Sequence, residues 1–200
     1  MSEFKRVAEH EVLDLIIKRW SARAMSGRRL DQKILNQLFE AAKWAPSCYN
    51  VQPWRFVYAH KGSTAWQKMY DLQVDFNKKW TINSSVLVLV ISYKLFPWNK
   101  EPNHTHSFDT GSAVQNMCLQ ATSLNLVIHG MAGFDYDKAR KEFKIPNNYN
   151  IEAMYAIGYP ADKEVLPTEL QDKEVLSDRN KINSFCFEDD FKELQHEQSS

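Results

Sequence analysis

Trp44-Ala-Pro-Ser-Cys-Tyr-Asn-Val-Gln-Pro-Trp54 joins a segment with helical periodicity to a segment rich in strand formers. Apolar residues recur at helical spacing over residues 31–43, and residues 54–60 favour a strand. Two prolines restrict the backbone of the link, and hydroxyl, thiol and amide groups lie between them. By itself, the stretch predicts either a loop that binds a planar ligand or a well-capped connection.

The rest of the chain mixes helices and strands without a repeat or a linker. Helices are expected near residues 8–20, 31–43 and 62–80, and strands near 54–60, 86–93 and 152–159. Residues 110–134 carry no charged side chain but several amides and hydroxyls. They predict a helix buried against another element or another subunit. The order favours a single α+β domain over residues 1–200.

Composition excludes several classes of partner. Lysine plus arginine and aspartate plus glutamate number 25 each, so no overall charge favours nucleic acid or an anionic membrane. The longest apolar run, residues 86–91, is too short to span a bilayer, and residues 1–6 lack a signal-peptide core. A cytoplasmic location is therefore expected. The three scattered cysteines and the His104/His106 pair do not form a metal-ligand pattern, so no metal is expected.

Residues 18–23, Lys-Arg-Trp-Ser-Ala-Arg, form a local cluster of cations around a hydroxyl. Arg19 and Arg23 have forked guanidinium groups, and Ser21 adds a hydroxyl, so this cluster could bind an anion. A solvated basic helix end would show the same residues.

Four motifs resemble the FMN-dependent nitroreductase family. Arg19-Trp-Ser-Ala-Arg23 resembles its RRSxR phosphate motif, and Pro46-Ser-Cys-Tyr-Asn-Val-Gln-Pro-Trp54 resembles its PSSxNxQPW motif. Gly130-Met-Ala-Gly-Phe-Asp135 is similar to its GGFD turn, and Ala156-Ile-Gly-Tyr-Pro160 to its (A/V)xGYP strand end. They occur in the family's order, and the resemblance covers about residues 10–185.

The resemblance implies a nitroreductase-like fold, in which helices flank a central, mainly antiparallel sheet. It also implies an intertwined homodimer with FMN in two clefts at the subunit interface, and a C-terminal extension, about residues 161–200, that wraps the partner subunit. The implied activity passes hydride from NADH or NADPH through flavin N5 to an electron-poor acceptor such as a nitroaromatic or a quinone. No catalytic side chain is then needed.

The resemblance assigns the cofactor contacts to fourteen positions: Arg19, Trp20, Ser21, Arg23, Pro46, Ser47, Cys48, Asn50, Gln52, Asn77, Met131, Ala132, Gly133 and Arg179. The arginines and Ser21 would bind the phosphate, the amides would face the flavin ring, and the backbone at residues 132–133 would approach N5. The sequence departs from the family where Cys48 replaces a serine, where Ala132 replaces the glutamate of some relatives, and where Lys181 replaces a proline. Asn77 would equally suit a helix surface.

Tyr49, Phe96 and Trp98 are candidates for stacking on an aromatic acceptor, and could equally anchor their loops to the core. Two other functions stay open at this point. One is an FMN-binding or storage protein without useful turnover, and the other is a flavin-cleaving or dehalogenating relative with the same fold.

Overall fold

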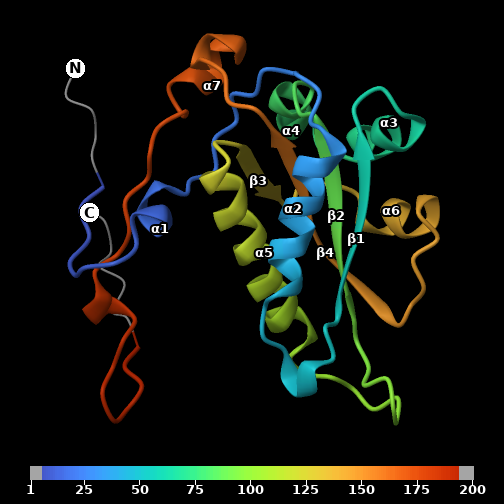
Figure 1. Ribbon diagram of the computed structural model, residues 1–200, viewed down its shortest axis with the longest axis vertical. Coiled ribbons are helices and arrows are strands. Elements are labelled where there is room, and N and C mark those ends of the chain that lie inside the picture. Colours follow the sequence, from blue (N-terminus) through green and yellow to red (C-terminus); the bar gives the residue numbers. More distant parts are fainter. Residues whose placement is uncertain (1–5, 194–200) are drawn as a thin grey trace.

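Strand β2, Val86–Tyr93, carries the longest apolar run and lies inside a four-stranded sheet in the computed structural model, which describes residues 6–193 (Figure 1). The strand order is β1-β2-β4-β3, and every neighbouring pair is antiparallel. The other strands are β1 (Trp54–His60), β3 (Val127–Met131) and β4 (Tyr149–Gly158). The α+β class and the antiparallel sheet are confirmed.

Helices cover β2 on both faces because its side chains are apolar on both. Alternate residues of a strand point to opposite faces. Val86, Val88 and Val90 belong to the core formed with α2 (Gln32–Lys43) and α5 (His106–Ser123). Leu87, Leu89 and Ile91 belong to the core formed with α3 (Thr64–Asp71), α4 (Asp75–Thr81) and α6 (Tyr136–Glu142).

The segment at residues 110–134 is a helix only in its first half. Helix α5 ends at Ser123, Asn125 takes a positive φ of 52°, and β3 begins at Val127. Asparagine adopts this left-handed conformation more readily than most residues, so it suits a helix end. Strand β3 and helix α6 were not predicted.

The single helix expected over residues 62–80 is wrong, because the chain breaks between α3 and α4. At the break, Gln73 forms a bridge with Phe134 and the Val74 N–H donates to the Gly133 carbonyl at 3.0 Å. These contacts with a distant segment replace the local helical bonds, and they place α4 beside residues 133–135.

The helix expected over residues 8–20 is also wrong in most of its length, since α1 spans only Asp14–Lys18. Val7 and Leu13 are 82% and 74% exposed, so little packing supports this segment. Short helices without such packing are marginal in water.

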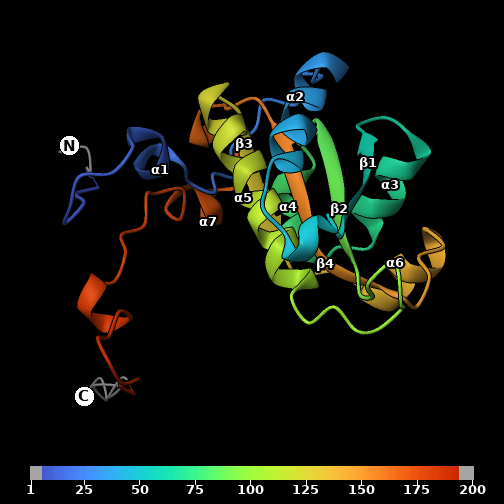
Figure 2. The same cartoon turned by 60° about the horizontal axis from the view of Figure 1, so that its bottom comes forward.

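The segment containing α1 and the C-terminal segment extend away from the sheet on the same side (Figures 1 and 2). They contact each other, because Arg6 Nε donates to the Ser177 carbonyl at 2.8 Å and the Ile182 N–H donates to Glu9 at 2.9 Å. The short helix α7, Thr168–Gln171, follows β4 along the chain and precedes the C-terminal segment. Within residues 6–193, no helix is long and apolar enough to cross a membrane.

Gly130 provides a test of sheet packing. It pairs with Tyr155 across β3 and β4, and an added Cβ would lie 2.6 Å from Tyr155 Cζ. We expect Gly130→Ala to reduce the free energy of unfolding by about 1–3 kcal/mol, as overpacking does. Urea denaturation measures this. Adding Tyr155→Val removes the ring, so the double variant should lose less than the sum of the two single losses; additive losses would contradict the clash.

Candidate functional site

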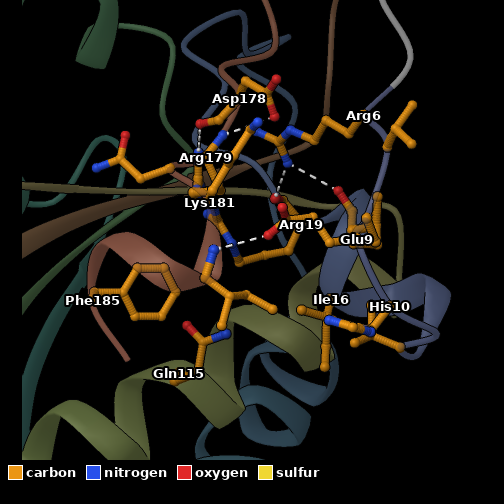
Figure 3. Close-up of a pocket in the computed structure, with 16 residues that line it drawn as sticks. Arg6, Glu9, His10, Ile16, Arg19, Gln115, Asp178, Arg179, Lys181 and Phe185 are labelled. Carbon is orange, nitrogen blue, oxygen red and sulfur yellow. Dashed lines mark hydrogen bonds between the residues drawn. The ribbon is translucent and has the colours of Figure 1, made fainter. Parts of the chain in front are cut away.

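Two of the arginines expected at the phosphate, Arg19 and Arg179, line the same cavity of about 760 Å³ (Figure 3). The cavity lies between the segment containing α1, the C-terminal segment and Gln115 of α5. Arg179 donates to the Ser177 hydroxyl at 3.0 Å, and Arg19 donates to the Ser21 hydroxyl at 3.2 Å. The structure therefore brings together two cations that are 160 positions apart in the sequence.

Arg6 is a third cation of this cavity, and the sequence motifs did not reveal it. Its guanidinium donates to the carbonyls of Ile17 and Arg19 at 2.9 and 2.7 Å, near the end of α1 where carbonyls lack helical partners. Burial, followed by the charges of Arg179 and Arg19, lowers the pKa of Arg6. Three neighbouring guanidinium groups repel one another, so the cluster favours binding of an anion.

Arg23 lies beyond this cavity and is held by a carboxylate that the motifs also missed. Glu174 accepts the backbone N–H groups of Arg23 and Ala24 at 2.7 and 2.8 Å, and its second oxygen lies 3.9 Å from the Arg23 guanidinium. Among the described residues, the buried Arg23 Nε has no hydrogen-bond partner. Trp20 packs against the core, and with Glu174 it lines a second cavity on the other side of this segment.

The loop at residues 46–52 has an unusual backbone. Tyr49, Asn50 and Gln52 have positive φ angles of 49°, 55° and 49°, which cost energy in residues other than glycine. The loop is held by two bonds: the Ser47 hydroxyl accepts the Gln52 N–H at 3.0 Å, and Asp109 accepts the Cys48 N–H at 3.0 Å. Pro46 and Asn50 are exposed, so this strained loop presents its polar groups to solvent.

Asn77 and Gly133, both expected near the flavin ring, contact each other. The Asn77 side chain is buried, and its Nδ2 donates to the Gly133 carbonyl at 3.0 Å. A surface helix position is therefore excluded for Asn77. Gly133 has no room for a side chain, because an added Cβ would lie 2.9 Å from both Asn77 and Val74. Ala132 is exposed beside it, whereas Met131 belongs to the core.

Helix α5 separates the loop at residues 46–52 from residues 20–24 within one chain. The loop contacts Asp109 in the first turn of α5, whereas residues 20–24 line a cavity with Thr122 in its last turn. At roughly 1.5 Å per residue, these turns are about 20 Å apart. One chain therefore does not bring the loop and the segment at residues 20–24 into one pocket.

Tyr49, Phe96 and Trp98 surround a separate hollow of about 580 Å³, together with Asn99. The rings contact one another, with centroids 4.9 Å apart for Phe96 and Trp98 and 5.7 Å apart for Tyr49 and Trp98. Tyr49 and Trp98 are 80% and 58% exposed, so they do not anchor the loops in the core.

His106 lies 3.6 Å from the Glu152 carboxylate, but this pair does not extend to a set of metal ligands among the described residues. In residues 6–193, no three histidine, cysteine or acidic side chains gather in a way that could hold a metal ion. The His106 ring instead contacts the Ser92 hydroxyl at 2.7 Å.

The geometry defines a class: an α+β protein with an arginine cluster, a strained polar loop and a glycine turn packed against a buried asparagine. A sequence model of the Nitroreductase family matches residues 16–83 and 64–159. The chain belongs to the Nitroreductase family.

Solved structures and a curated relative agree with this assignment. A crystal structure described as an oxidoreductase containing FMN is 39% identical, covers 96% of this chain and 99% of its own, and superposes with a TM-score of 0.90. A nitroreductase from Desulfovibrio desulfuricans in complex with FMN is 23% identical, covers 92% of this chain and all of its own, and shares the fold with a TM-score of 0.71. A relative from Archaeoglobus fulgidus named NADH dehydrogenase/NAD(P)H nitroreductase is 26% identical over 77% of this chain and 88% of its own.

His129 makes the free energy of unfolding depend measurably on pH. Its Nδ1 lies 2.9 Å from the Ala22 carbonyl, so this nitrogen carries the proton, and the ring packs on Trp80 at 4.5 Å. Burial is the main cause that lowers the pKa of His129 from its ordinary 6.5, and the charges of Arg23 and Arg19 lower it further.

The pKa of His129 is lower in the folded chain than in the unfolded chain. As the pH falls, the unfolded chain therefore binds a proton at this residue first. Its contribution to stability is complete above about pH 6.5 and is lost as the pH falls toward the folded-state pKa. We expect His129→Asn, which keeps a donor toward Ala22, to flatten this part of the curve of unfolding free energy against pH. If urea titrations show the same dependence of unfolding free energy on pH in His129→Asn, another titrating group causes that dependence.

Proposed function

We propose that this chain is an FMN-dependent oxidoreductase that takes hydride from NADH or NADPH and passes it to an electron-poor acceptor such as a nitroaromatic or a quinone. Family membership supports the NAD(P)H-dependent flavin chemistry, and the observation that carries the proposal is the cluster of Arg6, Arg19 and Arg179 at one cavity. A flavin phosphate is a dianion that such a cluster would stabilise.

The donor set fits FMN at its phosphate end. Arg19, Ser21 and Arg179 offer guanidinium and hydroxyl donors, and the buried Arg23 Nε has no partner within residues 6–193. Arg6 donates to backbone carbonyls, so its role is to hold the backbone of Arg19 and Ser177 in place.

The donor set also fits the flavin ring. The exposed Asn50 and the partly exposed Gln52 present amide groups to the ring edge, and the backbone of residues 132–133 lies at an open surface. Asn77 uses one N–H on the Gly133 carbonyl and keeps its oxygen and second N–H for a ligand. When bound, FMN supplies the hydride chemistry, and these residues bind and orient it.

We further propose that the functional unit is a homodimer whose C-terminal extension wraps the partner. The extension from residue 161 contacts the N-terminal segment and leaves Phe185 and Phe191 60% and 85% exposed. Phe108 on the outer face of α5 is 78% exposed. A second copy would cover this apolar surface. Residues 194–200 lie outside the described part of the chain, and the expected cytoplasmic location stays a prediction.

The decisive experiment is an anaerobic titration of the purified protein with NADH and then NADPH, followed at the visible flavin band. We expect the band to bleach, and an added nitroaromatic or quinone to restore it. Bound flavin that stays oxidised would favour a storage protein or another reductant. A protein that binds no flavin would contradict the proposal.

Arg19 and its neighbour Lys18 make a matched pair for testing the phosphate site. Arg19 lines the cavity, whereas Lys18 pairs with Asp14 at 3.4 Å and does not line it. We expect Arg19→Ala to weaken FMN binding by roughly 1.5–3 kcal/mol, the value of a hydrogen bond to a charged group, and Lys18→Ala to have little effect. Flavin fluorescence titration of the apoprotein measures both, and sedimentation checks the oligomer. Equal losses of FMN affinity in the two variants would indicate a nonspecific effect of positive charge rather than a hydrogen bond from Arg19 to the phosphate.

A further inference from the structure

A hairpin at residues 94–103 carries two of the three rings that surround the hollow at Tyr49, namely Phe96 and Trp98. Leu95 and Pro102 form a bridge, the Phe96 N–H donates to the Glu101 carbonyl at 2.8 Å, and the Asn103 N–H donates to the Lys94 carbonyl at 2.8 Å. These bonds close the hairpin on itself, so its placement depends on the contacts at its base, one of which is the Lys94 N–H donating to the Asn148 carbonyl at 3.0 Å.

The Asp109 carboxylate connects the base of this hairpin to the cofactor loop. Asp109 is 5% exposed, and its Oδ2 lies 3.0 Å from the Cys48 N–H and 3.1 Å from the Thr105 hydroxyl. That hydroxyl also lies 2.9 Å from Asn103 Oδ1, but it has one proton, and a carboxylate is the stronger acceptor. One oxygen therefore binds the loop through Cys48 and the hairpin through Thr105, the residue before α5, whose N–H donates to Asn103 Oδ1 at 3.1 Å.

The placement of Asp109 favours this role. It lies in the first turn of α5, where the helix dipole stabilises a negative charge. Its burial makes each hydrogen bond stronger and an unpaired oxygen more costly than at the surface. Rigid α5 thus supplies a fixed point for two segments that are otherwise surface loops.

The segments joined by Asp109 are those that carry the aromatic rings. Tyr49 follows Cys48 directly and has a strained backbone, and Phe96 and Trp98 belong to the hairpin. The edge-to-face contacts of Tyr49 with Phe96 and Trp98, at 6.0 and 5.7 Å, exist only while both segments keep their positions. The exposed rings of Tyr49, on the strained loop, and of Trp98, on the hairpin that contacts it, point to a ligand rather than to folding.

We propose that Asp109 is a positioning residue that holds Tyr49, Phe96 and Trp98 as an acceptor subsite for planar aromatic compounds. This inference rests on the proposed function, because it treats the ligand as the acceptor. The ring faces offer stacking area, and among the residues lining the hollow only Asn99 adds an amide, so the subsite selects by planarity and not by charge.

Thr105 provides the test, because it can be changed without leaving Asp109 without a partner. Thr105→Val keeps the shape and removes the hydroxyl, and Thr105→Ser keeps the hydroxyl. The first measurement is the affinity of the oxidised protein for anthraquinone-2-sulfonate, followed by quenching of tryptophan fluorescence without any nicotinamide. We expect Thr105→Val to weaken it roughly tenfold and Thr105→Ser to match the unaltered protein.

Steady-state kinetics give the second measurement. Thr105→Val should raise KM for the quinone, and leave unchanged both the reduction of bound flavin by NAD(P)H and KM for ferricyanide, which does not stack. Trp98→Ala should raise KM for the quinone similarly, and the double variant should show little further increase, because both changes act on one subsite.

Each other outcome overturns the inference. Equal effects of Thr105→Val and Thr105→Ser, or equal increases in both KM values, would show a structural role. A lower sedimentation mass for Trp98→Ala would show that the rings cover a partner subunit. Measuring the quinone affinity requires no turnover. If NAD(P)H fails to reduce the bound flavin, that result contradicts the proposed function, and the binding measurement still decides whether the subsite exists.

Discussion

The burial of β2 on both faces is the constraint from which the rest of the structure follows. Its valines need cover on one side and its leucines and Ile91 on the other, so the chain supplies α2 and α5 for one face and α3, α4 and α6 for the other. Packing against the sheet fixes α5 along its whole buried side. Because α5 is fixed, Asp109 and Thr122 become two reference points at its ends, with the loop at residues 46–52 beside the first and residues 20–24 beside the second.

The sequence predicted those helices and strands that depend on residues close together along the chain. The apolar run of β2 and the periodicity of α2, capped by Asp31, could be seen in the sequence. The break at Gln73 and the strand β3 could not, because both depend on partners far along the chain. Family motifs located the loop, the arginines and Gly133, whereas nothing marked Arg6. Asp109 had a signal, since it is the last charged residue before the uncharged stretch at 110–134.

Unfavourable local energies concentrate at the parts of the chain assigned to ligands. Positive φ angles occur at three residues of the loop at 46–52, and three guanidinium groups gather where burial, followed by the charges of Arg179 and Arg19, lowers the pKa of Arg6. Neither feature stabilises an isolated chain, since strained backbone and like charges both cost free energy. Such features persist when the surrounding structure enforces them, and here the enforcing contacts are Asp109 for the loop and backbone carbonyls for Arg6.

The separation of these features along α5 and the proposed homodimer are two aspects of one geometry. In one chain, the loop lies at the first turn of α5 and residues 20–24 at the last. The outer face of α5, with exposed Phe108 and Gln115, carries no charge beyond its first turns. If two copies pair through this face about a twofold axis across the helix, the first turn of each α5 meets the last turn of the other. The loop of one copy would then approach the phosphate-binding segment of its partner, so the contact that covers the apolar face would also complete the cofactor site, and flavin affinity and dimer stability would be thermodynamically linked.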